Sequence, residues 1–159
     1  MSMNRNSRIA NSRQGFTLVE LMVTIAILAI LATIGLPSFQ RLIADYRVSA
    51  QANSVQGLLQ FARSEAVKRR ESVSVCSAGD NLIVEIGPCS ETPTPLRILP
   101  LDTRVEFLGF DDSVGITYAS SGFLPQSVTT PPTLTFRLSV ASDREISIDR
   151  SGYSQVVKR

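Results

Sequence analysis

An uncharged stretch of twenty residues near the N-terminus, Leu21–Gln40, constrains this chain more than any other feature. A helix of that length covers about 30 Å, which is the thickness of the hydrocarbon core of a bilayer. One carboxylate, Glu20, directly precedes the stretch, where its burial in lipid costs roughly 2.5–3.5 kcal/mol or more. A charge in that position requires a partner. The nearest candidate is a free α-amine on Phe16, which cleavage after Gly15 would create.

The segment around this glutamate, GFTLVEL at residues 15–21, resembles the processing site of type IV pilins and type II secretion pseudopilins. In that family a prepilin peptidase cuts after the glycine and methylates the new N-terminal phenylalanine. The resemblance implies cleavage between Gly15 and Phe16 and N-methylation of Phe16. An ordinary signal anchor with a chance glutamate is the alternative. A secretory signal peptide fits poorly, because its apolar region is only about 7–15 residues long.

Residues 1–15 are expected to form a leader that is removed. The leader holds Arg5, Arg8 and Arg13 and no acidic residue, so its loss leaves 13 basic and 14 acidic side chains, a net charge of −1. The positive charge of the whole chain therefore does not indicate a nucleic-acid surface. Because positive flanks stay in the cytoplasm, we expect a single pass through the inner membrane with the C-terminal domain in the periplasm.

The composition predicts one long helix with two different halves. Residues 16–37 are expected to span the membrane, and residues 38–70 to form an amphipathic helix. Pro37 removes a backbone hydrogen bond, so a kink is expected there. The pilins that the sequence resembles have a proline at the matching place, where the helix bends or melts on assembly. The resemblance thus marks Glu20 and Pro37 as assembly residues.

Apolar residues in the second half recur at steps of three and four, which predicts a stripe on one helix face. The stripe consists of Phe39, Leu42, Ile43, Tyr46, Ala50, Leu58, Leu59, Ala62 and Ala66. Such a stripe can pack on a sheet or on neighbouring helices, and we expect it to do both along its length. The basic cluster Lys68–Arg70 suits the C-terminal end of the helix dipole.

Residues 71–159 read as a β-rich domain, because short apolar runs alternate with clusters of turn residues. The expected strands are Val73–Cys76, Leu82–Ile86, Leu96–Leu101, Val105–Leu108, Gly115–Tyr118, Leu134–Leu138, Glu145–Ile148 and Gln155–Val157. The segment Ser120–Thr133, which holds three prolines, is the best candidate for a mobile loop. The fold class is therefore α+β, with a long N-terminal helix packed on a C-terminal antiparallel β-sheet domain, the pilin fold.

Further segments resemble the GspH/FimT family. Residues 60–69 and 73–76 are similar to its helix end and first strand, and residues 116–122 to a later strand that ends in a glycine turn. Many members carry tryptophans after the cysteines, and this chain has none. Members implicated in DNA uptake carry a Gly-Arg-x-Arg element. Here Gly152 is followed by Tyr-Ser-Gln, so that element is absent as such.

The two cysteines, Cys76 and Cys89, are expected to form a disulfide, since the periplasm is oxidising. Two buried free thiols are the alternative. The chain has no histidine, which argues against a zinc site and against His-assisted nucleophiles. Adjacent carboxylates at Asp111 and Asp112, near Asp102 and Glu106, match no calcium-loop spacing. We expect no cofactor, no metal and no enzymatic activity.

A basic cluster near the C-terminus is the candidate for weak DNA contact. It consists of Arg144, Arg150, Lys158 and Arg159. Three acidic residues interleave with it (Asp143, Glu145 and Asp149), so a solvated sheet edge is the competing interpretation.

The predicted function is that of a minor type IV pilin, processed by prepilin peptidase and incorporated into, or priming the assembly of, a pilus filament. Pilus biogenesis, twitching motility and DNA uptake are the processes that such a filament serves. Its partners would be the peptidase, other pilins or pseudopilins, and the inner membrane. The alternatives are a GspH-like minor pseudopilin of the type II secretion system and, from another class, a pilus-associated DNA-binding module for transformation.

Overall fold

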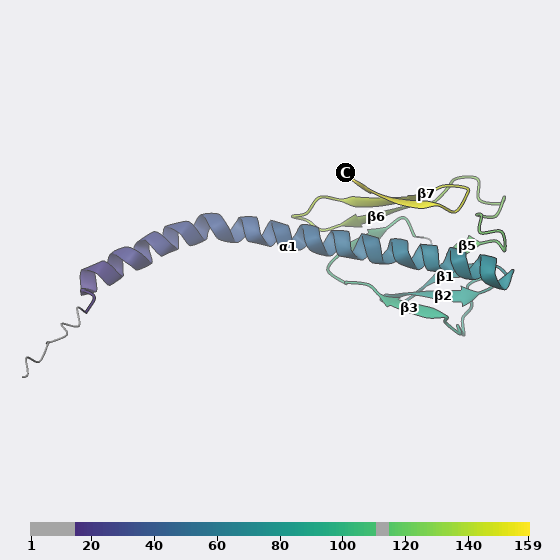
Figure 1. The fold of residues 1–159 in the computed structure, drawn as a ribbon, viewed down its shortest axis with the longest axis horizontal. Helices are drawn as coiled ribbons and strands as arrows, with labels where there is room; N and C mark the ends of the chain where they lie inside the picture. The colour runs from purple at the N-terminus through teal and green to yellow at the C-terminus, as the bar shows by residue number, and fades with distance from the viewer. Residues whose placement is uncertain (1–14, 111–114) are drawn as a thin grey trace, which may run out of the picture. The chain divides into compact units, whose positions relative to one another are not determined.

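A computed structural model describes residues 15–110 and 115–159. The chain divides into two compact units, one up to Ser38 and one from Phe39 onward. One helix, α1 (Leu18–Arg69), passes through this division, and eight strands follow it in the described part of the second unit (Figure 1). The expected helix is confirmed, with ends that lie within two residues of the prediction.

The strands form two antiparallel sheets of four strands each, with the orders β3-β2-β1-β5 and β4-β6-β7-β8. Their bounds are β1 Val73–Ala78, β2 Asn81–Ile86, β3 Arg97–Pro100, β4 Glu106–Leu108, β5 Ile116–Tyr118, β6 Thr133–Arg137, β7 Arg144–Ile148 and β8 Ser154–Lys158. All eight predicted strands are present, each within two residues of its expected bounds. The sequence did not indicate the division into two sheets.

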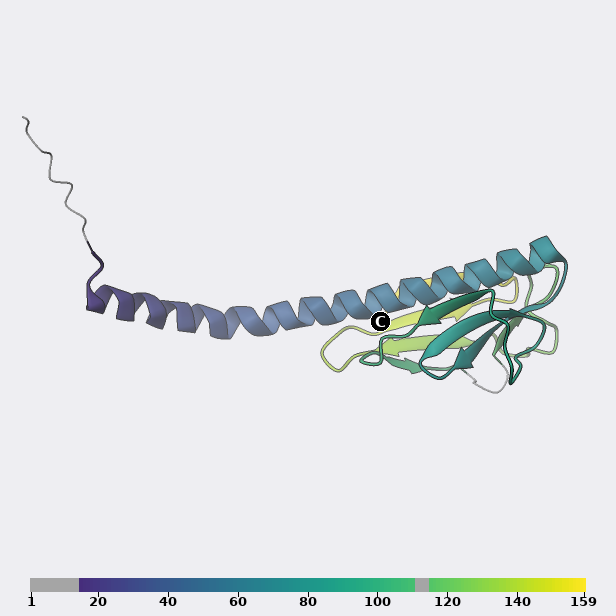
Figure 2. The ribbon, with the colours of Figure 1, turned by 90° about the horizontal axis from the view of Figure 1, so that it is seen from below.

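One buried cluster joins the second part of α1 to both sheets. Val55 and Leu59 of the helix share it with Val75 of the first sheet and with Phe136 and Ile146 of the second. The strands contribute alternate residues, as in β6, where Leu134 and Phe136 are buried and their neighbours are more exposed. Figure 2 shows both sheets on the same side of this part of the helix.

The helix face that packs on the sheets differs in part from the predicted stripe. Leu58, Leu59, Ala62 and Ala66 are buried as expected. Phe39, Leu42 and Tyr46 are 63%, 64% and 75% exposed, and smaller side chains are buried at this level instead. These are Ala44, Val48 and Ala52. Close approach of a helix to a sheet favours small residues, whereas periodicity weighted by side-chain size favours the large ones. The large side chains remain available for other partners.

The C-terminal end of α1 has its cations partly neutralised. Lys68 and Arg69 form ion pairs with Glu65, at 3.1 Å and 2.8 Å. Hydrogen bonds from Arg69 and then from Lys68 hold the pKa of the Glu65 carboxyl below its usual value. Arg70 follows with a φ of 58°, a left-handed conformation that commonly ends a helix. This geometry agrees with a solvated helix end.

The segment Ser120–Thr133 is irregular, as expected, and the rest of the second unit holds it at several points. The Gly122 carbonyl accepts a hydrogen bond from Arg63 Nε of α1 at 3.0 Å. Leu124 is buried, and its N–H donates to the Arg150 carbonyl at 3.2 Å. The segment therefore connects the end of the helix to the turn between β7 and β8.

Gly152 lies in that turn and meets two requirements that only glycine satisfies. Its φ is 78°, in the left-handed region. A Cβ at this position would collide with the Gly122 carbonyl oxygen and would lie 3.1 Å from the Tyr118 ring. Gly152 therefore has a structural role in joining the two loops, independent of any role in ligand contact.

We predict opposite effects of two glycine-to-alanine changes. Gly152→Ala should lower the free energy of unfolding by about 2 kcal/mol or more, because strain and a backbone collision combine. Gly57→Ala is the matched control: Gly57 is exposed within α1, and a Cβ there meets nothing within 4 Å. It should raise stability by about 0.5–1 kcal/mol. Denaturant titration of the full chain in detergent measures both, and an unchanged midpoint for Gly152→Ala would contradict the assignment.

Candidate membrane anchor and processing site

The first part of α1 exposes every side chain that it carries. All described residues from Gly15 to Ile43 are exposed, and those from Leu21 to Leu36 are almost all apolar. By length and composition this is a helix that can cross a membrane. Water does not tolerate a continuous apolar surface of this size, since each buried Å² contributes roughly 25 cal/mol. The segment therefore needs lipid or other helices around it.

Two hydroxyl groups within the apolar segment are already satisfied by the helix itself. Thr24 Oγ1 donates to the Leu21 carbonyl at 2.8 Å, and Thr33 Oγ1 donates to the Ile30 carbonyl at 2.7 Å. An unsatisfied hydroxyl in hydrocarbon would cost several kcal/mol, so these bonds make the segment compatible with a bilayer.

The helix begins with a capping arrangement that includes Glu20. Thr17 Oγ1 accepts a hydrogen bond from the Glu20 N–H at 3.2 Å, which places Thr17 at the N-cap and Glu20 at the third helical position. The pattern Thr-x-x-Glu is the sequence signature of a capping box. Sequence reasoning assigned Glu20 to assembly alone and missed this local role, although the spacing carries the signal.

The proposed cleavage point lies just outside the helix. Gly15 and Phe16 are non-helical and exposed, and a Cβ at Gly15 would meet no atom within 4 Å. The bond between them is thus an exposed peptide bond that directly precedes the capped helix. Its cleavage stays a prediction.

Pro37 lies within α1, close to the division after Ser38. Lacking an N–H, it cannot donate to the carbonyl of Thr33 four residues earlier. Gly35 adds a second residue with low helix propensity. The kink and the assembly role expected for Pro37 stay predictions.

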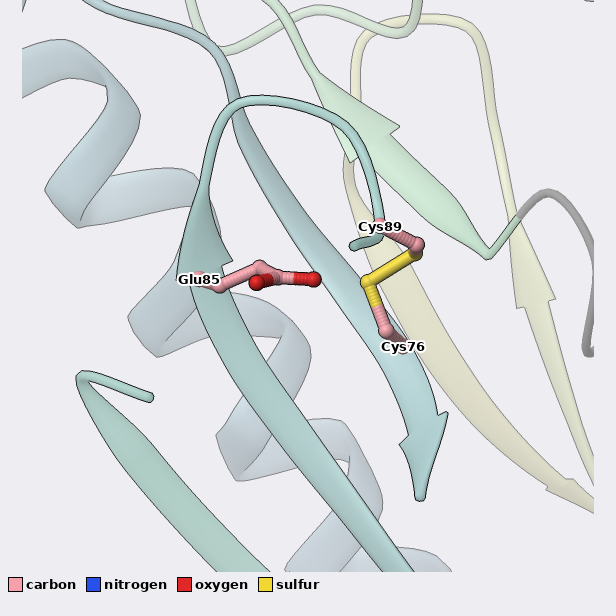
Figure 3. A group of neighbouring side chains, drawn as sticks. All are labelled: Cys76, Glu85 and Cys89. Atoms are coloured by element: carbon pink, nitrogen blue, oxygen red, sulfur yellow. A yellow bond between two sulfur atoms is a disulfide. The ribbon is translucent and has the colours of Figure 1, made fainter. Parts of the chain in front are cut away.

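The predicted disulfide between Cys76 and Cys89 is confirmed, with the two Cα atoms 5.7 Å apart. It ties β1 to the segment that follows β2. Beside it lies the buried carboxylate of Glu85 from β2 (Figure 3). This carboxylate accepts hydrogen bonds from Ser90 N at 2.8 Å and from Ser90 Oγ at 3.0 Å. Sequence reasoning missed Glu85, because a charged residue in a strand normally predicts an exposed position.

The possible ligand atoms of Cys76, Glu85 and Cys89 lie within 4.8 Å of one another, which is close enough to raise the question of a metal site. The sulfurs are joined to each other, so they offer no thiolate to a metal. Asp102 is one of the four carboxylates that match no calcium-loop spacing in the sequence. Arg104 donates to both of its oxygens at 2.8 Å, and this keeps the pKa of the Asp102 carboxyl below its usual value. Glu106 lies in β4, and residues 111–112 lie outside the described residues.

The four basic residues of the candidate DNA contact do not form one cluster. Arg144 of β7 lies opposite Lys158 of β8 in the strand register, and Arg159 follows Lys158 in the chain. Arg150 lies beyond the other end of β7 and donates to the Thr129 carbonyl at 3.2 Å. Arg159 is also paired with Glu145 at 2.8 Å. The structure thus separates Arg150 from Arg144, Lys158 and Arg159.

Two family models match the chain. The prokaryotic N-terminal methylation motif matches residues 10–36, and the family described as type II transport protein GspH matches residues 51–152. The first match covers most of the apolar part of α1 described above. The second covers α1 from Gln51 onward and the strands β1 to β7.

Similar sequences and structures are pilins. The type IV major alpha-pilin of Moraxella bovis is 38% identical over 117 residues, which are 70% of each chain. A fimbrial protein of Pseudomonas aeruginosa is 36% identical over 69 residues, 43% of this chain and 45% of that protein. The crystal structure of the type IV minor pilin FimU from Pseudomonas aeruginosa matches 69% of this chain and 87% of that chain, with a TM-score of 0.58 at 22% identity. At that identity the likeness shows the fold.

The methylation motif and the pilin fold together define a type IV pilin-like protein. Within that class the chain belongs to the GspH family, whose model covers most of its length. Pilins and pseudopilins are structural subunits, so the expectation that the chain is not an enzyme is confirmed.

We predict that loss of the disulfide lowers the stability of the fold. Replacing Cys76 and Cys89 together by serine should lower the free energy of unfolding by about 3 kcal/mol, because a cross-link over thirteen residues restricts the unfolded chain. Ser77→Ala, beside Cys76, is the control and should change stability by less than about 0.5 kcal/mol. Denaturant titration of the full chain in detergent, with and without reductant, compares the variants. A reductant effect on the double variant would show a cause other than the bridge.

Proposed function

We propose that this chain is a minor type IV pilin that is cleaved between Gly15 and Phe16, N-methylated on Phe16 and built into a pilus filament. The observation that carries the proposal is the apolar surface of α1 from Leu18 to Ile43, which the described chain leaves uncovered. The match of residues 10–36 to the methylation motif supports the processing step. The similarity to the Moraxella bovis pilin supports the filament.

In the first stage the subunit is anchored in the inner membrane. The basic side chains that precede Gly15 favour the cytoplasm for the N-terminus, so the β domain faces the periplasm. The disulfide is consistent with that compartment. The apolar half of α1 lies in lipid at this stage, with its threonine hydroxyls bonded to its own carbonyls.

In the second stage the same surface is covered by the helices of other subunits. Repeated head-to-tail contacts between related subunits build an open helix rather than a closed ring. The exposed Phe39, Leu42 and Tyr46 extend the apolar surface beyond the spanning stretch. Glu20 pairs with the α-amine of Phe16 on a neighbouring subunit, which resolves the charge that lipid tolerates poorly.

A minor pseudopilin of the type II secretion system is the second candidate. The description of the matched family as a type II transport protein favours it. The anchor, the processing step and the filament geometry are common to both candidates. Detection of the subunit in sheared surface pili, as opposed to its retention in the cell envelope, distinguishes them.

The cleavage site gives the first functional prediction. The mature protein purified from membranes should begin at Phe16, with a mass increase of one methyl group. Gly15→Leu should leave the full precursor in the membrane fraction, because a bulky side chain blocks the cleavage point. N-terminal sequencing and intact mass measure both. A mature N-terminus at any other residue would disprove the assignment.

The charge of Glu20 and its role in the helix cap can be tested separately. Glu20→Gln keeps a side chain that can complete the capping box and removes only the charge. We predict normal cleavage but strongly reduced incorporation into filaments, because an uncompensated α-amine in a low-dielectric site costs roughly 3–5 kcal/mol.

Thr17→Ala is the matched control, since it weakens the cap by about 1 kcal/mol and leaves the charge. It should assemble nearly as well as the natural chain. Immunoblots of sheared filaments, normalised to the processed protein in the membrane, compare the variants. Normal incorporation of Glu20→Gln together with a defect in Thr17→Ala would show that Glu20 serves only to start the helix.

A further inference from the structure

Five basic side chains gather at one end of the second sheet and on the adjoining turn of α1. This basic rim consists of Arg41, Arg137, Arg144, Lys158 and Arg159. β6 ends at Arg137, β7 begins at Arg144 and β8 ends at Lys158, so the antiparallel pairing brings these ends to the same edge. Arg159 continues past that edge, and its N–H donates to the Asp143 carbonyl at 3.1 Å.

The loop between β6 and β7 is fastened to α1 at the level of Arg41. Ser142 N–H donates to Asp45 Oδ1 at 2.8 Å, and Arg144 Nε donates to Ser49 Oγ at 3.2 Å. Arg41 and Asp45 line an open hollow of about 470 Å³ together with the loop residues 139–142. The rim and its loop are therefore adjacent to Arg41, the first charged residue after the uncharged stretch.

Two of the cations in the basic rim are exposed and have no carboxylate partner among the described residues. Arg137 is paired with Asp143 at 3.1 Å and Arg159 with Glu145 at 2.8 Å. Arg41 and Lys158 are exposed and make no ion pair within the described residues. At the loop tip, Val140 is 55% exposed. The surface thus combines free cations with one protruding apolar side chain.

We propose that the basic rim and Val140 rest on the phospholipid headgroups of the membrane that α1 spans, with a preference for anionic headgroups. The proposal rests on the membrane-anchored stage of the proposed function. Asp45 lies only about 6 Å along the helix from Arg41, which is the depth of one headgroup layer. Cations attract anionic headgroups within a Debye length, and an apolar side chain inserts at the acyl boundary.

This contact holds the β domain against the membrane surface before assembly. Paired carboxylates, Asp143 and Glu145, keep the rim from becoming strongly basic. The attraction is therefore weak enough to be reversed when the subunit leaves the bilayer. The three carboxyl-terminal cations that first suggested DNA contact belong to this rim, and Arg150 does not.

The chain has no tryptophan, so one introduced indole reports the depth of its own position. Val140→Trp probes the rim. Phe123→Trp is the matched control, because Phe123 is 52% exposed and follows Gly122, which is bonded to Arg63. Arg63 lies about 33 Å along α1 from Arg41. The full mature chain is placed in vesicles of phosphatidylcholine, alone or with phosphatidylglycerol, with and without brominated acyl chains.

We expect blue-shifted emission and quenching for Val140→Trp, at least about twofold stronger than for Phe123→Trp, and stronger still with phosphatidylglycerol. Adding Arg41→Gln and Lys158→Gln to Val140→Trp should remove the preference for phosphatidylglycerol. Equal quenching of the two indoles in protein that resists carbonate extraction would overturn this proposal and leave the anchor intact. Extraction by carbonate would overturn both.

Nucleic acid is the competing ligand for the rim. A mobility shift of the full chain in detergent with duplex DNA tests it. Binding that Arg41→Gln and Lys158→Gln abolish, together with equal quenching of the two indoles, would assign the rim to nucleic acid and contradict the membrane proposal.

Discussion

The proposed function depends on the exposed apolar surface on the first half of α1, which must be removed from water by lipid or by other helices. Every described side chain of this half is exposed, and the hydrophobic effect makes its exposure to water strongly unfavourable. The local details of this half fit an environment without water. Its threonine hydroxyls bond to its own carbonyls, and Thr17 satisfies an N–H at its start. In the proposed function, lipid and then neighbouring helices provide the cover in turn.

The second half of the same helix buries its apolar face against the two sheets of its own chain. Small side chains such as Ala44 and Ala52 face the sheets, and a single buried cluster unites the helix with both of them. The disulfide and the buried Glu85 fix the segment after β2, while Gly152 joins the loops at the far end of the helix. This unit therefore has its own core and leaves the large side chains near Phe39 facing outward.

Local patterns in the sequence predicted the helix and all eight strands, because alternation and turn residues are short-range signals. The two sheets depend on pairings between distant residues, such as Val75 with Ile116, which no local pattern encodes. The basic residues show the same limit. Arg150 lies only a few residues from Arg144 in sequence, but the extended strand β7 places the two residues at opposite ends of the sheet. Glu85 was missed because a buried charge contradicts residue type. The small-residue face was missed because the larger apolar side chains beside it give the stronger periodic pattern.

The most direct test follows the exposed surface of α1 through both stages. A photo-crosslinking amino acid at Leu28, which is exposed, should label phospholipid in the membrane fraction and other pilin subunits in sheared filaments. The same probe at Leu58, which is buried, should label only its own chain in both fractions. Mass spectrometry identifies the labelled partners. Labelling of neither lipid nor subunits at Leu28, or the same partner in both fractions, would contradict the account.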